Sequence, residues 1–526
     1  MAQTSDIYGN TRLAPGDMER LAARVVTSGD RSSIGVETPI TESEIGSVPA
    51  CTAADVATAV DRARGAQPEW AATPVESRVA VLERFGDLVF DHRDDLLDTV
   101  QLETGKVRQD ALEELLDIPS TCSYYGSNGP TELADSERSG LIPLATTATV
   151  SYDPVGVVGV ISPWNYPLTL SFTDAIPALL AGNAVVCKPD ERTPFVALAL
   201  AELLEEAGLP EGVFQVVTGE GAVAGPALID AVDYVVFTGG TETGRTVAER
   251  AGRNLIDCSL ELGGKNPMVV LDDADVGTAA RGAVTGAFTN AGQLCLAPER
   301  IYVDEDRYDD FLDAFVGATR ELSLGHSFSY GPDVGSLISA DHLESVRESV
   351  DSAVEAGASL FSGGRARPDV GPCFYEPTIL TDVAPDSRII CEETFGPVVS
   401  VVPVSDADEA VERANDTAYG LNGSVWTGDL DRGRDIARRI DCGTVCLNDP
   451  YAVGWAAVDA PMGGIGDSGL GRRHGPEGIN RFVESKTIAT SRIGPFDSPP
   501  WLPHGVAARL LSGFGAVQRR LTRWLR

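Results

Sequence analysis

The sequence predicts an α/β protein with two doubly wound lobes, and three observations support this fold class. From about residue 147, short β-branched runs alternate with stretches of helical periodicity. The same alternation resumes at about residue 267. The 526 residues, 43% of them hydrophobic, are enough to build more than one core. Buried strands that alternate with helices indicate parallel sheets covered by helices.

The chain is expected to begin with helices, because apolar residues recur at three- and four-residue spacing in Ala53–Ala66 and Val75–Thr104. Apolar, β-branched runs then predict the strands Thr147–Tyr152, Val155–Ile161, Ala184–Cys187, Phe214–Val217 and Tyr234–Thr238. Helices are expected at about 170–181, 194–207 and 221–230, and from Glu242 onward. The second lobe is expected to run from the strand Pro267–Leu271 to the strand Thr444–Asn448.

The C-terminal residues 495–526 predict a linker, 495–505, followed by a basic amphipathic helix. One helical stripe is apolar: Val506, Leu510, Phe514, Val517, Leu521 and Trp524. The basic residues of this tail are Arg509, Arg519, Arg520, Arg523 and Arg526. We favour a helix that docks on the acidic body or on a neighbouring subunit. A helix that lies on a membrane surface is the alternative.

The net charge of −37 argues against a nucleic-acid partner, which needs a basic face. Lysine and arginine total 41, and only four of these residues are lysines. This acidic, lysine-poor composition is typical of a halophile, where salt screens the repulsion between surface carboxylates. An ordinary acidic enzyme is the alternative interpretation.

The chain is expected to be cytoplasmic and to hold no metal. No apolar run reaches the ~18–20 residues of a spanning helix, and residues 1–30 lack the pattern of a signal peptide. The nine cysteines are scattered without CxxC spacing, which argues against a disulfide framework and against a zinc site.

Three segments carry candidate catalytic residues. Glu261 lies in Leu260–Pro267 beside a Gly-Gly pair, and Cys295 ends the run Asn-Ala-Gly-Gln-Leu-Cys. Asn165 stands in Pro-Trp-Asn-Tyr-Pro. Taken singly, the three are more often a paired carboxylate, a small buried residue and a turn residue. Together they offer a base, a nucleophile and an amide donor, which covalent thiol catalysis requires.

With the downstream run Glu392–Val398, these segments resemble the NAD(P)-dependent aldehyde dehydrogenases. The resemblance spans about residues 35–495 and includes Tyr419–Leu421, Pro461–Gly464 and Glu484–Thr487. It implies that Cys295 is the nucleophile and that Glu261 activates the water that hydrolyses the thioester. It also implies that the Asn165 side chain and the Cys295 backbone N–H stabilise the oxyanion.

The resemblance also implies a cofactor site for NAD, with NADP possible. The turn Phe237–Gly244 matches the Gly-x₄-Gly turn of the family, in which a helix N-terminus faces the pyrophosphate. Lys188 is expected to hold the adenine ribose, and Glu191 to favour NAD by repelling a 2′-phosphate. The implied cofactor residues are Ile161, Ser162, Pro163, Trp164, Lys188, Glu191, Gly221, Phe237, Thr238, Gly239, Gly240, Gly244, Leu262, Gly263, Glu393 and Phe395.

The domain organisation follows from the same resemblance: two doubly wound lobes plus an oligomerisation β-hairpin. Residues 1–136 and 153–260 would form the NAD-binding domain, and residues 261–478 the catalytic domain. Residues 137–152 and 479–494 would form the oligomerisation element, which predicts a homodimer or homotetramer.

The substrate is expected to be succinic semialdehyde. The segments Pro163–Thr169, Arg472–Gly478 and Glu484–Thr487 resemble a succinate-semialdehyde dehydrogenase branch. One semialdehyde subgroup has an arginine eight residues after the motif asparagine, where this chain has Thr173. A broad-specificity dehydrogenase of aromatic or aliphatic aldehydes therefore stays open, with a CoA-acylating dehydrogenase or a thiol esterase less favoured. The expected substrate tunnel is formed by Tyr166, Phe172, Thr173, Leu294, Tyr451 and Trp455.

Overall fold

The computed structural model describes residues 11–524 except 15, 30, 141–144 and 493–501. The chain divides into two compact units. Unit 1 comprises Met1–Leu133 and Pro154–Glu484, and unit 2 comprises Ala134–Asp153 and Ser485–Arg526.

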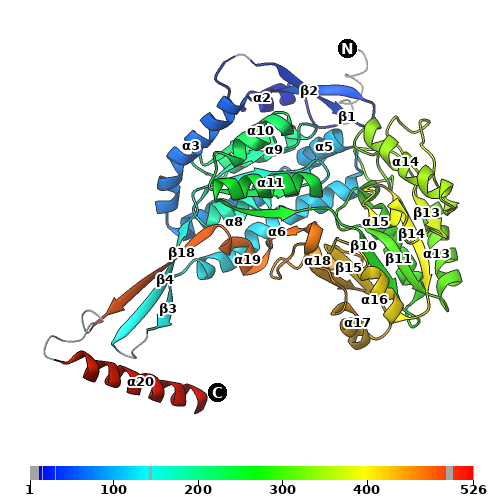
Figure 1. Ribbon diagram of the computed structural model, residues 1–526. Helices are drawn as coiled ribbons and strands as arrows, with labels where there is room; N and C mark the ends of the chain where they lie inside the picture. The colour runs from blue at the N-terminus through cyan, green and yellow to red at the C-terminus, as the bar shows by residue number, and fades with distance from the viewer. Residues whose placement is uncertain (1–10, 15, 30, 141–144, 493–501, 525–526) are drawn as a thin grey trace. The chain divides into compact units, whose positions relative to one another are not determined.

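Unit 1 contains two large sheets and one two-stranded hairpin (Figure 1). The first has the strand order β17-β9-β8-β5-β6-β7. Its strands are β5 (Val157–Ile161), β6 (Ala184–Lys188), β7 (Phe214–Val216), β8 (Tyr234–Thr238), β9 (Asp257–Glu261) and β17 (Gly469–Leu470). The strands β5 to β9 pair in parallel, and only the short edge strand β17 is antiparallel. The predicted doubly wound lobe is confirmed, because these apolar runs are buried from both faces.

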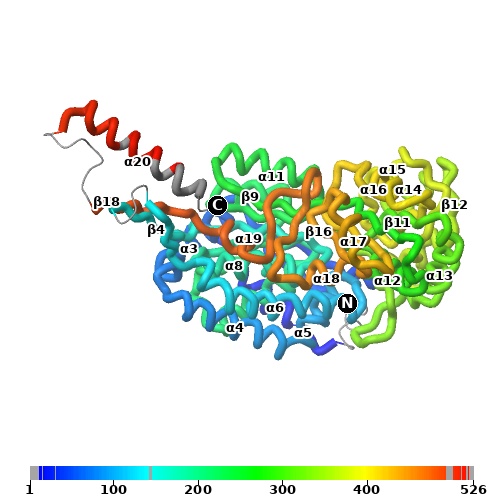
Figure 2. Tube along the Cα trace, turned by 90° about the horizontal axis from the view of Figure 1, so that it is seen from below, coloured from blue at the N-terminus to red at the C-terminus, as the bar shows by residue number. Residues whose placement is uncertain are grey.

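Helices cover both faces of the first sheet. One face carries α3 (Ala53–Ala72), α10 (Gly221–Ile229) and α11 (Thr241–Asn254). The other side carries α7 (Pro167–Phe172), α8 (Ala175–Leu180) and α9 (Pro194–Glu206), which contact α4 (Val75–Asp91), α5 (Arg93–Thr104) and α6 (Arg108–Glu132). Figure 2 shows α11 on one side of this lobe and α4, α5 and α6 on the opposite side. The remaining elements of the lobe are α2 (Asp17–Ala22), α19 (Gly475–Asn480) and the hairpin β1 (Ser33–Thr38) and β2 (Ser43–Pro49).

Three sequence predictions for this lobe were wrong in detail. The helix expected over Val75–Thr104 is two helices, because α4 ends at Asp91 and α5 starts after His92 with Asp94 and Asp95 in its first turn. The helix expected at 170–181 is interrupted between α7 and α8. The β1–β2 hairpin was missed in a stretch expected to be mainly helical.

The second sheet has the order β12-β13-β14-β11-β10-β15-β16, with only β12 antiparallel to its neighbour. Its strands are β10 (Asn266–Val270), β11 (Pro298–Asp304), β12 (Ser359–Ser362), β13 (Thr378–Thr381), β14 (Val398–Val404), β15 (Asn422–Trp426) and β16 (Thr444–Leu447). Its helices are α12 (Val276–Phe288), α13 (Tyr308–Arg320), α14 (Ala340–Glu355), α15 (Arg388–Cys391), α16 (Ala407–Asn415), α17 (Leu430–Ala437) and α18 (Ala452–Trp455). Short 3₁₀ turns occupy Thr289–Gly292 and Gly466–Ser468.

The cores of the second lobe follow the alternation of its central strands. In β10, Met268 and Val270 point to the core under α12 and α13, whereas Val269 points to the core under α16 and α17. Successive strand residues face opposite sides of a sheet, so a continuous apolar run supplies both cores at once. This is the second doubly wound lobe that the sequence predicts.

Unit 2 holds a three-stranded sheet of order β18-β4-β3 and the helix α20 (His504–Trp524). Its strands are β3 (Ser136–Ser139), β4 (Thr146–Pro154) and β18 (Val483–Ser491). Ile479 and Phe482, which were predicted to start the oligomerisation element, instead lie in the core of unit 1. On α20, Val506, Leu510 and Phe514 are 45%, 62% and 40% exposed.

Parts of several predicted segments fall outside the described residues. These are residues 1–10 of the N-terminal segment, residues 141–144 and 493–494 of the predicted oligomerisation element, residues 495–501 of the linker, Arg526, and the side chains of Val517, Arg520, Leu521, Arg523 and Trp524. Within the part of the chain that the structure describes, every helix is too short or too polar to cross a membrane.

Candidate active site

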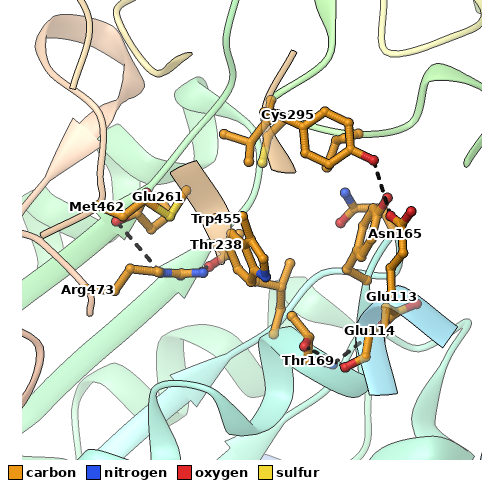
Figure 3. Close-up of a pocket in the computed structure, with 15 residues that line it drawn as sticks. Glu113, Glu114, Asn165, Thr169, Thr238, Glu261, Cys295, Trp455, Met462 and Arg473 are labelled. Carbon is orange, nitrogen blue, oxygen red and sulfur yellow. Dashed lines mark hydrogen bonds and ion pairs between the residues drawn. The ribbon is translucent and has the colours of Figure 1, made fainter. Parts of the chain in front are cut away.

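One pocket of unit 1 gathers the three predicted catalytic residues from distant parts of the chain (Figure 3). Asn165 precedes α7, Glu261 ends β9, and Cys295 follows the 3₁₀ turn after α12. The complete lining is Glu113, Glu114, Asn165, Tyr166, Thr169, Leu170, Thr238, Glu261, Leu294, Cys295, Leu296, Tyr451, Trp455, Met462 and Arg473.

The backbone before Cys295 takes an unusual path. Asn290, Ala291 and Gly292 all have positive φ, at 51°, 54° and 71°. A Cβ on Gly292 would lie 2.1 Å from the carbonyl oxygen of Gly396, so only glycine fits there. The turn places Cys295 at the pocket. The backbone carbonyl of Cys295 accepts a 2.7 Å hydrogen bond from Asn266 Nδ2.

Cys295 is half-buried in the pocket, and the charges of Glu393 and Glu261 act on its thiol. Burial, and next the nearby charge of Glu393, raise the pKa of this thiol to about 12. The thiol is therefore protonated at neutral pH in this arrangement, and it needs a base or a nearby positive charge to become a nucleophile.

Asn165 is 4% exposed and is held from both ends. Its side-chain Nδ2 donates to the carbonyl of Gln293 at 3.0 Å. Its backbone carbonyl accepts hydrogen bonds from Lys106 Nζ at 2.7 Å and from Asn290 Nδ2 at 3.1 Å. The second N–H of this amide remains available to a ligand in the pocket.

Lys106 is itself anchored in the protein interior. It forms a fully buried ion pair with Glu114 of α6, and its ammonium lies 4.0 Å from the ring centre of Tyr166. The pair therefore ties α6 to the Pro163–Pro167 segment that carries Asn165.

Glu261 is 4% exposed at the carboxyl end of β9. Burial raises its pKa to about 7, against an opposing effect of the positive charge on Arg473. A carboxyl group with this pKa can exchange a proton near neutral pH, as a general base must.

A second cleft, of about 800 Å³, shares Thr238 with the first pocket. It is lined by eleven of the predicted cofactor residues: Ile161, Ser162, Pro163, Trp164, Lys188, Glu191, Gly221, Phe237, Thr238, Gly239 and Gly240. The N-terminus of α11 opens on this cleft, and its N-cap Gly240 provides no side-chain cap. A Cβ on Gly240 would meet nothing within 4 Å. Uncapped backbone N–H groups and open space beside them fit the pyrophosphate of a dinucleotide.

The other five predicted cofactor residues do not line this cleft. Gly244 packs beneath Leu262, where a Cβ would lie 2.4 Å from Leu262 Cδ2. Glu393 accepts the backbone N–H of Gly264 at 2.9 Å, and a Cβ on Gly263 would lie 2.5 Å from Glu393 Oε2. Phe395 packs edge-on against Trp164, with ring centres 5.5 Å apart. Gly244 and Leu262 therefore pack against each other, Gly263 lies against Glu393, and Phe395 lies against the cleft residue Trp164.

Two predicted tunnel residues do not reach the pocket. Phe172 is fully buried between Phe85 and Phe214, with ring centres 5.5 Å and 4.8 Å away, because it lies on the opposite side of α7 from Leu170. Thr173 is buried at the end of α7 and is also absent from the lining. The other four, Tyr166, Leu294, Tyr451 and Trp455, line the pocket.

Seven lining residues were not predicted from the sequence: Glu113, Glu114, Thr169, Leu170, Leu296, Met462 and Arg473. Glu113 and Glu114 stand in the long helix α6, where no local pattern distinguishes pocket residues from buried structural ones. Long-range packing places them in the pocket, because Glu113 accepts a hydrogen bond from Tyr451 across 338 positions of the chain and Glu114 accepts one from Leu168 across 54. Among the described residues, no group of three or more His, Cys, Asp or Glu side chains could hold a metal ion.

The fold is α/β, and the pocket that holds Cys295 shares Thr238 with a cleft large enough for a dinucleotide. This combination defines a class of dinucleotide-dependent enzymes with a cysteine nucleophile. Residues 25–488 match the sequence model of the Aldehyde dehydrogenase family, and the chain belongs to this family. This confirms the predicted class, an NAD(P)-dependent oxidoreductase acting on aldehydes.

Named relatives and solved structures agree with this membership. The chain is 48% identical to the "Putative succinate-semialdehyde dehydrogenase [NADP(+)] 2" of Mycobacterium tuberculosis, over 93% of this chain and 94% of that one. It is 50% identical to the "Putative succinate-semialdehyde dehydrogenase [NADP(+)]" of Mycolicibacterium smegmatis, over 89% and 91%. The crystal structure of betaine aldehyde dehydrogenase from Staphylococcus aureus with NAD+ matches with a TM-score of 0.87 at 32% identity, over 96% and 100% of the two chains.

Proposed function

We propose that this protein oxidises an aldehyde to a carboxylic acid through a covalent intermediate on Cys295. The observation that carries the proposal is the convergence of Cys295, Glu261 and Asn165 on one pocket that meets the larger cleft at Thr238. A nucleophile, a base and an amide donor are the groups that this reaction needs.

The proposed steps assign one task to each residue. The Cys295 thiol loses its proton to solvent in the pocket, which the positive charge of a bound oxidised NAD(P) would favour. The resulting thiolate attacks the aldehyde carbon, and the oxyanion accepts hydrogen bonds from Asn165 Nδ2 and from the Cys295 backbone N–H. NAD(P) bound in the cleft supplies the hydride acceptor that turns the thiohemiacetal into a thioester. Glu261 then takes a proton from water, the water oxygen bonds to the thioester carbon, and the C–S bond breaks to free the Cys295 thiolate and the acid.

We propose NAD as the preferred cofactor. The Glu191 carboxylate lies 3.1 Å from Lys188 Nζ and lines the cleft. A carboxylate there favours ribose hydroxyls and repels a 2′-phosphate. The mycobacterial relatives carry NADP(+) in their names, so the two cofactors must be compared directly.

Succinic semialdehyde is the first candidate substrate, and it rests on the names of the two mycobacterial relatives. The pocket favours a second candidate, an uncharged aliphatic or aromatic aldehyde. Seven of its fifteen lining residues are apolar or aromatic: Tyr166, Leu170, Leu294, Leu296, Tyr451, Trp455 and Met462. Arg473 is the only cationic lining residue of this described pocket, and it is already bound to Asp174. A free carboxylate on the substrate would have to compete with that bond.

The deciding experiment measures NADH and NADPH formation with succinic semialdehyde, benzaldehyde and an aliphatic aldehyde, in molar salt. A kcat/KM preference of ~100-fold for succinic semialdehyde, about 2.7 kcal/mol, would establish a carboxylate site. A flat or apolar-favouring profile would establish a broad aldehyde dehydrogenase. Cofactor-independent turnover would instead indicate a thiol esterase, and a requirement for coenzyme A would indicate an acylating enzyme.

Two variants test the assigned roles. Cys295→Ala is expected to abolish turnover, whereas Cys391→Ala, at an exposed free cysteine, is the matched control and should retain it. Glu261→Gln is expected to give a burst of NADH and then stop. Normal steady-state turnover by Glu261→Gln would overturn the base assignment.

We also propose that unit 2 mediates a homodimer or homotetramer. A three-stranded sheet is close to the smallest that is stable, and the outward residues of β18 are exposed. A second copy that covers this sheet would supply the missing apolar contacts.

A further inference from the structure

Behind Glu261 lies a buried ionic cluster formed by Asp174, Arg473 and Arg481. Arg473 Nη2 donates to Asp174 Oδ2 at 3.1 Å and to Thr238 Oγ1 at 3.2 Å. Arg481 Nη2 bonds to the other oxygen, Asp174 Oδ1. The side chains of Asp174 and Arg473 are only 1% and 3% exposed, so this cluster is sealed from solvent.

One donor of the cluster, the Nε–H of Arg473, is unused and lies near Glu261. Arg473 Nε and Glu261 Oε1 are both buried, and neither has a hydrogen-bond partner among the described residues. These two atoms are 3.9 Å apart. A movement of ~1 Å would bring them to hydrogen-bonding distance, and leaving both unpaired is costly.

The charges of the cluster are unequal. Two arginines face one aspartate, which leaves an excess positive charge next to Glu261. Burial alone would raise the pKa of Asp174, but the charges of Arg473 and Arg481 outweigh it, so the pKa of Asp174 is lowered and the carboxylate stays ionised. Asp174 therefore remains able to hold the Arg473 guanidinium in place over a wide pH range.

Titratable groups from several elements surround Glu261 and the cluster. Asp117 of α6 and His474 interact with Arg473 and Asp174. The charged or titratable groups that face it are Arg472 and Arg473 from the segment after β17, Asp174 before α8, Arg481 after α19, and Cys295 across the pocket. Arg473 is the largest of the charge effects on Glu261 and Asp174 is the next, with opposite sign.

We propose that Arg473 is a positioning residue that holds the ionised Glu261 carboxylate through its Nε–H, with Asp174 clamping the guanidinium. This inference rests on the proposed role of Glu261 as the base. When Glu261 takes a proton from water, its carboxylate charge disappears and the Arg473 contact weakens. The fixed charge of Arg473 then favours loss of that proton and restores the base for the next turnover.

The test compares the pH dependence of steady-state turnover in three variants, with an aldehyde that gives an NADH burst in the native enzyme. The acid limb is the part of the profile where turnover falls as the pH is lowered. In Arg473→Met this limb should move up by about one pH unit or more, because loss of an opposite charge at this distance raises the pKa of Glu261 by that much. In Asp174→Asn it should move down, because a negative charge is removed while the amide oxygen of the new side chain can still accept a hydrogen bond from Arg473. Arg473→Lys should restore the limb close to its native position.

The matched control is Arg78→Met. Arg78 is also a buried arginine, but its guanidinium donates to the backbone carbonyls of Ala71, Thr73 and Leu180. Arg78→Met should lower the melting temperature of the protein through lost packing, but it should leave the acid limb of the pH profile in place.

The outcomes separate the inference from the proposed function. If Glu261→Gln gives a burst and stops, but the limb stays in place in Arg473→Met and Asp174→Asn, the inference is wrong and the base assignment stands. If Glu261→Gln turns over normally, the proposed function itself fails. Should Arg473→Met not fold, the other two variants decide the question. An acid limb that moves down in Asp174→Asn and stays near its native position in Arg473→Lys supports the inference, and an unmoved limb in Asp174→Asn would overturn it.

Discussion

Glu261 shows how burial can adapt a single side chain to a task. An exposed glutamate is almost fully ionised near neutral pH and is a weak base. Here burial raises the pKa to about 7, while the neighbouring positive charge of Arg473 limits the rise. The base is therefore strong enough to take a proton from water and still largely ionised above neutrality.

This pKa predicts the pH dependence of turnover. The ionised form is present above the pKa and is lost as the pH falls, so the thioester-hydrolysis rate should be constant above about pH 8 and fall about tenfold per unit below about pH 6. Stopped-flow measurement of the burst and of the steady-state rate across pH checks it. A steady-state rate that stays flat to pH 5 would contradict the assignment.

Asn165 is held more rigidly than a turn residue needs. The anchoring by Lys106, Asn290 and Gln293 fixes its amide before substrate arrives. Asn165→Ala should lower kcat by ~100- to 1000-fold, the usual effect of losing one oxyanion donor. Asn128→Ala is the control, because Asn128 lies on the exposed face of α6 and bonds only to the Tyr124 carbonyl. Similar losses in both variants would argue against the oxyanion role.

At the scale of elements, the connection from α12 to β11 determines where the nucleophile stands. Three consecutive residues of positive φ turn the chain sharply within a few positions. Gly292 lies against the backbone of Gly396, so the Cys295 turn is packed directly on the segment that carries Glu393 and Phe395. The nucleophile and the cofactor-side residues are thereby fixed to each other through backbone contact.

Replacement of Gly292 by alanine tests this connection. The new Cβ would meet a backbone oxygen at 2.1 Å and would also occupy a strained left-handed conformation, so we expect a loss of about 3 kcal/mol in stability and most of the activity. Gly317→Ala is the control, because a Cβ in the exposed middle of α13 meets nothing within 4 Å. That variant should gain about 0.5–1 kcal/mol. Equal melting temperatures for the two variants would contradict the prediction.

For the whole molecule, the balance of charge is the dominant surface property. The surface forms many arginine–carboxylate pairs, such as Arg250–Asp230 and Arg347–Glu344, and each exposed pair contributes little. Salt screens both these attractions and the repulsion between unpaired carboxylates. With 78 acidic against 41 basic residues, repulsive pairs outnumber attractive ones, so screening should stabilise the fold.

The prediction is that the melting temperature rises steadily as KCl increases from about 0.1 M to 2 M, with most of the gain below about 1 M, where the Debye length has fallen to ~3 Å. Differential scanning calorimetry at constant pH measures it. A melting temperature that is flat or falls with salt would mean that ion pairs outweigh repulsion, and the halophile interpretation would then lose its physical basis.

The sequence alone determined the properties that depend on local pattern. Apolar β-branched runs located the strands β5, β6 and β8 almost to the residue, because buried parallel strands need continuous apolar character. The motifs around Asn165, Glu261 and Cys295 identified the family. They did so by their resemblance to the motifs of the family, which the match over residues 25–488 confirms.

Only the tertiary structure decided which side chains face the site. Phe172, expected in the tunnel, turns into the core, whereas Glu113 and Glu114 enter the pocket from α6. Arg473 donates a hydrogen bond to Asp174 across 299 positions of the chain, and no local pattern in either segment predicts that contact. Side-chain direction depends on where a helix begins and on what packs against it, so long-range packing had to specify it.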